Sequence, residues 1–465
     1  MKKQFSLLIG CLVCAFIFMS ATIDLDNLFN YANQDVPGYI TKDNTTTNTI
    51  TDEVTTLGRV LFYDTNLSAN NTIACASCHI QEKAFGDVAT LSVGLNGELT
   101  GRHSMRLINS RFADEDRFFW DERAATLEEQ TTRPIQDHVE MGFSGTDGDP
   151  DIDDLITSLE AIDYYQDLFG FAYGDTTITE ARLQEALAQF IRSIQSFDSE
   201  FDTGLAQVNN LNQDFPNYTA EENQGKQLFI SPPPNGGAGC IACHRAPEFD
   251  IDPNSLNNGI IRVAGSLTEI DLTNTRSPSL RDLVNPNGSL NGPLMHNGNP
   301  TSLLEVINHY NQIQNDPANT NLDPRLTMPG GQTQSLNLTD AEKDALVAFL
   351  RTLTGNDVYT NEKWSNPFED DGSITIIGGA LSTQEEAFKK RVSVYPNPIV
   401  TTLTISIDGG NYKISIYDLN GKKVFQDTTQ GDASLQLEAL QKGIYVLNIE
   451  DLDTRKSYIK KLIKQ

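Results

Sequence analysis

Two short stretches of the chain combine residue types that can do redox chemistry. Residues 75–79 are Cys-Ala-Ser-Cys-His and residues 240–244 are Cys-Ile-Ala-Cys-His, so each is a Cys-x-x-Cys-His motif. Two thiols three positions apart on a helical turn can bond to the two vinyl groups of one porphyrin, and the adjacent His can then reach the iron. This spacing is the attachment motif of c-type haem. The sequence therefore predicts two covalently bound haems.

Two other interpretations of the motifs fit less well. A thioredoxin-like redox pair does not need the following His. A zinc site would take four thiolates from the two pairs and leave both His without a role. The residues predicted to bind the haems are Cys75, Cys78, His79, Cys240, Cys243 and His244, with His79 and His244 as iron ligands.

The other two cysteines, Cys11 and Cys14, lie in an apolar run over residues 5–19 that follows two lysines. A run of about 15 residues is short for a membrane-spanning helix and is typical of a signal peptide. We therefore expect residues 1–21 to be a signal peptide and the protein to be exported. Residues 8–11 resemble a lipoprotein cleavage site, but too few apolar residues precede them.

The charge of the chain excludes some classes of partner. A formal net charge of −29 repels the phosphates of nucleic acids and anionic lipid. An acidic surface can steer a basic redox partner, or it can serve solubility alone. With 465 residues, the chain is long enough for two or three hydrophobic cores.

A weak internal repeat suggests two related lobes. Residues 58–62 are Gly-Arg-Val-Leu-Phe and residues 225–229 are Gly-Lys-Gln-Leu-Phe, and each precedes one Cys-x-x-Cys-His motif. Residues 22–50 are rich in Asn, Asp and Thr, which predicts a mobile leader before a first compact unit that begins near Thr51.

Sequence patterns typical of helices indicate where each lobe begins and ends. Apolar residues at three- and four-residue steps over 183–194 predict an amphipathic helix that ends the first lobe. Capping boxes at 219–222 and 339–342 open two more helices, the second being the last helix of the second lobe. The predicted domains are a lobe at 51–205, a lobe at 218–366 and a polar linker at 367–391.

The C-terminal part changes character. Apolar and polar residues alternate over 403–407 and 414–416, and residues 418–421 supply a turn between strands. We expect a small antiparallel β-sandwich over 392–465. The predicted fold class is mainly α, with two cytochrome c-like haem lobes followed by this β-sandwich.

The β-rich end resembles a known sorting domain. Residues 394–398 (Val-Tyr-Pro-Asn-Pro), 418–422, 443–445 and the lysine-rich end are similar to the C-terminal sorting domain of type IX secretion substrates. The resemblance implies an address label read by the type IX secretion machinery, and a protein in the periplasm or, after transport, at the cell surface or secreted. The alternative is a β-sandwich that binds carbohydrate or protein partners.

Residues 51–366 resemble the dihaem cytochrome c peroxidase family, which includes MauG-like enzymes. Besides the two haem motifs, the resemblance rests on residues 57–64, 119–124, 127–130, 139–142, 277–281 and 295–296. It implies that Glu140 moves a proton between the two peroxide oxygens, that Gln130 orients the peroxide, and that Trp120 relays electrons between the haems.

The chain departs from the family at the first haem. Where family members can close the distal face of this haem with a His, the aligned residue is Leu95, which cannot bind iron. The first haem is therefore expected to stay open to peroxide without prior reduction. His103 or His138 could replace the missing ligand.

The sixth ligand of the second haem is Tyr310 by the same resemblance, with Met295, Met328 and His309 as alternatives. A phenolate oxygen favours ferric iron and lowers the reduction potential relative to Met. Family members also hold calcium with an Asn that follows an Arg, but here His103 follows Arg102. Calcium is compatible with the family, and nothing in this sequence supports it.

Three functions remain open. The first is a cytochrome-c peroxidase, an oxidoreductase that reduces hydrogen peroxide to water with electrons from a small donor protein, either a cytochrome c or a cupredoxin. The second is a MauG-like enzyme that oxidises residues of a protein substrate, which Tyr310 favours. The third is a dihaem electron carrier without catalysis, which Glu140 and Gln130 argue against.

Overall fold

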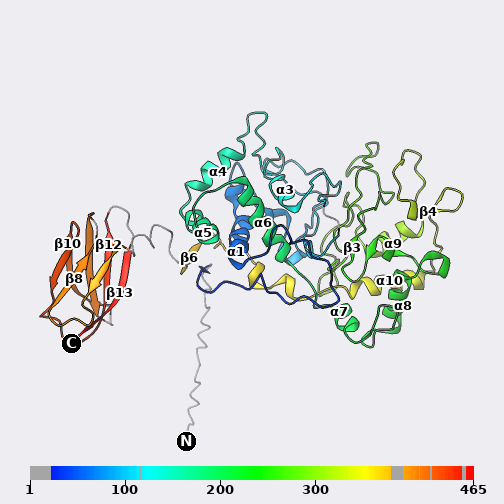
Figure 1. Cartoon of the computed structure of the whole chain (residues 1–465). Coiled ribbons are helices and arrows are strands. Elements are labelled where there is room, and N and C mark those ends of the chain that lie inside the picture. Colours follow the sequence, from blue (N-terminus) through cyan, green and yellow to red (C-terminus); the bar gives the residue numbers. More distant parts are fainter. Residues whose placement is uncertain (1–21, 115–116, 379–390, 408, 419–420, 453–456) are drawn as a thin grey trace, which may run out of the picture.

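The computed structural model describes residues 22–465 except 115–116, 379–390, 408, 419–420 and 453–456 (Figure 1). The predicted signal peptide, residues 379–390 of the predicted linker and two residues of the predicted turn at 418–421 lie outside this part. The described residues form three hydrophobic clusters, one for each haem-motif lobe and one in the C-terminal part. The clusters do not follow the predicted lobe bounds: Phe201 and Leu205 pack in the second cluster, and Val358, Tyr359 and Trp364 pack in the first. About 27% of the chain is helical, so the prediction of a mainly α fold is only partly confirmed. No described helix is long and apolar enough to cross a membrane.

The first lobe is built around two packed helices. Helix α1 (Asp52–Tyr63) begins at Thr51, whose side chain accepts a hydrogen bond from the Val54 backbone, and it packs on α6 (Glu180–Ser193). The predicted amphipathic helix over 183–194 is confirmed by α6. The other helices of this lobe are α2 (Cys75–Cys78), α3 (Leu127–Thr132), α4 (Ile152–Glu160) and α5 (Asp163–Tyr173).

The second lobe repeats this arrangement. Helices α8 (Ala220–Ile230) and α10 (Asp340–Arg351) begin at the two predicted capping boxes, both of which are formed. The lobe also contains α7 (Glu200–Leu205), α9 (Leu303–Asn311), the hairpin β2–β3 (His244–Arg245 and Asp250–Ile251) and the hairpin β4–β5 (Thr327–Met328 and Gln332–Thr333). Short 3-10 turns lie at Thr65–Leu67, Gln81–Lys83, Pro233–Asn235, Cys240–Ala242, Pro324–Leu326, Asp357–Tyr359 and Glu362–Trp364.

The internal repeat has a packing reason. A Cβ at Gly58 would lie 2.0 Å from the carbonyl oxygen of Ala186 in α6, and a Cβ at Gly225 would lie 1.9 Å from that of Ala345 in α10. In each lobe the first and last helices therefore approach so closely that only Gly fits at the crossing. The repeat noted in the sequence marks this shared helix crossing.

The N-terminal segment is ordered, so the prediction of a mobile leader is wrong. Residues 22–50, here called the strap, begin with β1 (Thr22–Asp24), which pairs in parallel with β6 (Thr375–Ile377). Tyr31 is fully buried and donates a 2.5 Å hydrogen bond to the carbonyl of Lys363. Tyr39 donates a 2.6 Å hydrogen bond to Asp202 of the second lobe. The strap thus contacts both lobes.

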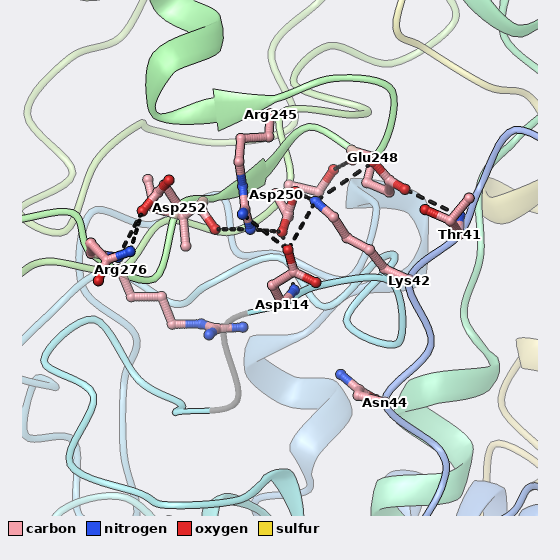
Figure 2. A network of polar contacts seen from close by, with 12 residues as sticks. Thr41, Lys42, Asn44, Asp114, Arg245, Glu248, Asp250, Asp252 and Arg276 are labelled. Carbon is pink, nitrogen blue, oxygen red and sulfur yellow. Dashed lines mark hydrogen bonds and ion pairs between the residues drawn. The ribbon is translucent and has the colours of Figure 1, made fainter.

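A charged cluster ties the strap to both lobes (Figure 2). The Lys42 ammonium lies 2.5 Å from Asp250, 3.6 Å from Glu248 and 3.8 Å from Asp114. Arg245, which directly follows the haem-motif residue His244, pairs with Asp114 at 2.9 Å and Asp250 at 2.8 Å. The cluster joins the strap, a first-lobe loop and the β2–β3 hairpin.

Replacing Lys42 with Met is expected to lower the free energy of unfolding by about 2–4 kcal/mol, because among the described residues it leaves buried Glu248 without a cation and buried Asp250 with Arg245 alone. The measurement is denaturant unfolding of the full-length protein followed by circular dichroism. Lys343→Met is the matched control, since Lys343 pairs with Asp340, whose side chain is 98% exposed, and its loss is expected to cost less than about 0.5 kcal/mol. Equal stability of the two variants would contradict the role assigned to Lys42.

The C-terminal part has the predicted antiparallel sandwich. One sheet has the order β10-β9-β12-β13 and the other the order β11-β8-β7, and the two share one hydrophobic core. The strands are β7 (Ser393–Tyr395), β8 (Thr402–Ser406), β9 (Tyr412–Asp418), β10 (Lys423–Thr429), β11 (Ala433–Gln436), β12 (Gly443–Asp451) and β13 (Ser457–Lys464).

Candidate active site

The first lobe contains a cavity lined by its haem-motif residues. A cavity of about 310 Å³ is lined by Cys78, His79, Gln130 and Glu140, and an adjoining cavity of about 60 Å³ is lined by these four together with Cys75. Helix α2 presents the two thiols, and α3 presents Gln130. The structure therefore brings five of the predicted site residues together.

The ring of His79 is oriented for metal binding. Its Nδ1 lies 3.1 Å from the carbonyl oxygen of Phe85, and because a carbonyl only accepts hydrogen bonds, Nδ1 carries the hydrogen. Nε2 then carries the lone pair that could bind a metal, with the hydroxyl oxygen of Ser104 3.5 Å away. A backbone carbonyl on the other ring nitrogen is the usual support for a His ligand. Burial also lowers the pKa of His79, which keeps the ring neutral.

Glu140 and Gln130 are polar groups without partners in this cavity. Neither side chain makes a hydrogen bond to another described residue. Burial, followed by repulsion from Asp137, raises the pKa of Glu140 to about 7. A carboxyl that titrates near neutral pH can both accept and return a proton. An unpartnered amide beside it can bind a small polar ligand.

The second lobe contains a larger cavity of about 420 Å³, lined by Cys240, Cys243 and His244. Its walls are mainly apolar and include Phe229, Leu283, Leu294, Leu346 and Leu350. The buried Nδ1 of His244 has no hydrogen-bond partner among the described residues, and burial lowers the pKa of His244 to about 4. Two free thiols and a neutral His ring on an apolar cavity suit a covalently held porphyrin.

Trp120 lies at the boundary of the two cavities and lines both. Its indole Nε1 donates a 2.7 Å hydrogen bond to the carbonyl of His103. Its ring packs edge-on against that of His296, with 6.1 Å between the ring centroids. The side chain is thus held in a fixed orientation between the two groups of haem-motif residues.

Comparison with known proteins decides the family. The methylamine utilization protein MauG of Methylophilus methylotrophus is 31% identical to this chain over 316 residues, which cover 66% of this chain and 84% of that protein. The sequence profile described as di-haem cytochrome c peroxidase matches residues 52–210. The chain belongs to the di-haem cytochrome c peroxidase family. Membership implies two c-type haems and makes the protein an oxidoreductase of the peroxidase and MauG class.

Further relatives agree with this assignment. The cytochrome c551 peroxidase of Nitrosomonas europaea is 28% identical over 313 residues, covering 64% of this chain and 79% of that protein. The crystal structure of a MauG-like protein associated with microbial copper homeostasis is 28% identical, with a TM-score of 0.58, and the match covers 72% of this chain and 99% of that one. Residues 393–465 match the secretion system C-terminal sorting domain, so this family member carries a type IX sorting domain.

The loop that carries Leu95, where the sequence comparison placed no haem-binding His, lies beside the segment that carries Glu140. The backbone N–H of Leu95 donates a 2.8 Å hydrogen bond to the carbonyl of Val139, so the Leu95 loop packs beside the segment that carries Glu140. Of the two alternative ligands, His138 is exposed, pairs with Asp149 at 2.7 Å and lines neither cavity. His103 lines both larger cavities, with its Nδ1 3.0 Å from the carbonyl of Ala89.

For the second haem of this peroxidase-family chain, the structure separates the four candidate sixth ligands. Tyr310, near the end of α9, and Met295 both line the second cavity. Met328 lies on β4, is 43% exposed and does not line this cavity. His309 does not line it either, and its Nε2 contacts the carbonyl of Asn258 at 2.8 Å.

Two residues of the site were not singled out by sequence reasoning. His296 is buried in the second cavity, and its Nε2 has no hydrogen-bond partner among the described residues. Its position within the 295–296 family motif was the available signal. Arg106 lines both larger cavities, and no motif in the sequence marks it.

Proposed function

We propose that the protein reduces hydrogen peroxide to water with electrons from a small redox protein, a cytochrome c or a cupredoxin. The observation that carries this proposal is the pair Glu140 and Gln130, which share one cavity with Cys78 and His79 and have no partners among the described residues. Cys75, Cys78 and His79 would hold the first haem, and Cys240, Cys243 and His244 the second. The first haem iron, when bound, supplies the electrons that break the peroxide O–O bond.

The protein's own residues handle the protons. Hydrogen peroxide takes up two electrons and two protons and yields two water molecules. The Glu140 carboxylate accepts the proton of one peroxide oxygen and returns it to the other, so that the second oxygen leaves as water. The Gln130 amide donates a hydrogen bond that holds the peroxide in the orientation this transfer needs. Trp120, which lines both cavities, would relay electrons between them.

A second candidate is the MauG-like oxidation of residues in a protein substrate. The observation that favours it is Tyr310 in the second cavity, since a phenolate ligand stabilises ferric iron. For either function, the sorting domain supports export with the type IX secretion machinery as a partner, to the periplasm, the cell surface or the medium.

Steady-state turnover of the purified holoprotein tests the proposed function. A reduced artificial donor is mixed with the as-isolated protein, and its oxidation is followed optically after hydrogen peroxide is added. We expect two donor electrons to be consumed per peroxide, without a prior reductive activation step, because Leu95 replaces the distal His. Protein that contains both haems but oxidises no donor would overturn the peroxidase proposal.

Tyr310→Phe is expected to change the visible spectrum of the second haem and to raise its reduction potential, because it removes a hard anionic ligand. Met295→Leu is the matched control, since Met295 lines the same cavity, and its spectrum is expected to match that of the unmodified protein. Spectroelectrochemical titration measures both quantities. A spectral change in Met295→Leu alone would assign the ligand to Met295 instead.

A further inference from the structure

Arg106 is a buried cation to which the proposed function gives no role. Its guanidinium lines both larger cavities. Its Nη2 donates a 3.1 Å hydrogen bond to the carbonyl of Ser279, while its buried Nε has no hydrogen-bond partner among the described residues. Asp282 acts on it electrostatically, but no ion pair joins Arg106 to a carboxylate in the described part of the chain. Among the described residues, one uncharged carbonyl is thus the hydrogen-bond acceptor that the structure gives to Arg106.

Burying a guanidinium without a counter-charge is energetically unfavourable. A buried arginine of the second lobe has such a counter-charge. Arg281 is fully buried, and Asp202 accepts hydrogen bonds from its two terminal nitrogens at 2.9 and 2.8 Å. Removing a charge from water is compensated only by a counter-charge or by strong hydrogen bonds. The corresponding anion for Arg106 is therefore expected to come from a ligand that occupies a cavity.

We propose that Arg106 binds a haem propionate at the boundary of the two cavities and that its positive charge raises the reduction potential of that haem. A haem carries two propionate carboxylates, and a guanidinium binds a carboxylate with two parallel hydrogen bonds. Reduction removes one positive charge at the iron, so a nearby cation stabilises the reduced state. The inference rests on the proposed two-haem content of the protein.

The reduction midpoints of the two haems test this role in the full-length holoprotein. Arg106→Gln keeps a hydrogen-bond donor but loses the charge, and we expect it to lower the reduction equilibrium constant of at least one haem about tenfold, which is ~59 mV for a one-electron couple. Arg106→Lys keeps the charge, so the midpoint potentials of both haems are expected to stay close to those of the unmodified protein. Titration of each haem separately shows which one supplies the propionate.

Arg182→Gln is the control. Arg182 pairs with Asp175 at 2.7 Å and lines neither cavity, so the loss of its charge is expected to leave both midpoints unchanged. Haem content per polypeptide is measured for every protein. Fewer than two haems in the unmodified protein would overturn the proposed function itself.

Two haems with unchanged midpoints in Arg106→Gln would overturn the role of Arg106 alone. If Arg106→Gln does not fold, the midpoint potentials of Arg106→Lys test the role of Arg106. Midpoints near those of the unmodified protein support the assignment, and a fall as large as tenfold in the equilibrium constant overturns it.

Discussion

Replacing Glu140 with Gln is expected to reduce steady-state peroxide turnover by about 10²- to 10⁴-fold, the range that general acid–base catalysis contributes. The amide is nearly the same size as the carboxyl but cannot accept and return a proton. Haem content and visible spectra should stay unchanged, because Glu140 is not a haem-motif residue. The measurement is initial rate against peroxide concentration with an artificial donor.

The pH dependence gives this prediction a second readout. Burial raises the pKa of Glu140 to about 7, so the carboxylate that accepts the proton is lost as the pH falls through 7. In the unmodified protein kcat/KM should therefore rise with pH to a plateau above about 7, and in Glu140→Gln this limb should disappear.

Glu129→Gln is the matched control, because Glu129 pairs with Arg133 at 2.5 Å near the surface and lines neither cavity. Its turnover is expected to match that of the unmodified protein. Unchanged turnover in Glu140→Gln would remove the proton-transfer role and would favour the electron-carrier alternative.

Replacing Cys240 and Cys243 together with Ala is expected to leave one haem per polypeptide after acid–acetone extraction and to unfold the second lobe. Without its haem, the second cavity of about 420 Å³ leaves apolar side chains such as Phe229, Leu283 and Leu346 without packing partners. The loss of this apolar contact destabilises the lobe. Limited proteolysis followed by mass spectrometry should show cleavage within the second lobe.

The corresponding double variant of the first haem motif, with Cys75 and Cys78 replaced by Ala, is the control. It should lose the first haem, keep the second and lose peroxide turnover, because Glu140 and Gln130 line the first cavity. A double variant at Cys240 and Cys243 that retains two acid-resistant haems would contradict the assignment of the second motif.

Local signals predicted the helices that carry the site. Thr219 and Thr339 open α8 and α10 because a capping box is a local hydrogen-bond pattern that the sequence displays directly. The strap was missed because its Asn, Asp and Thr residues are typical of loops. What orders it is distant in sequence: β1 pairs with β6 more than 300 residues away, and Tyr31 contacts Lys363.

The haem-binding residues could be predicted from the sequence because their spacing is set by the covalent attachment of haem. Two thiols and a His in five residues define one haem site, whichever fold surrounds them. The exclusion of Met328 and His138 from the cavities, by contrast, depends on how loops fold in three dimensions. Arg106 is a single residue without a motif, and only its place beside both cavities reveals a missing counter-charge.

The ratio of covalently bound haem to polypeptide in the purified full-length protein tests the account most directly. Pyridine-haemochrome absorbance after acid–acetone extraction, divided by protein concentration from amino-acid analysis, measures this ratio. The account predicts two haems per chain. A value of one or zero in protein produced with a functioning haem-attachment system would contradict it.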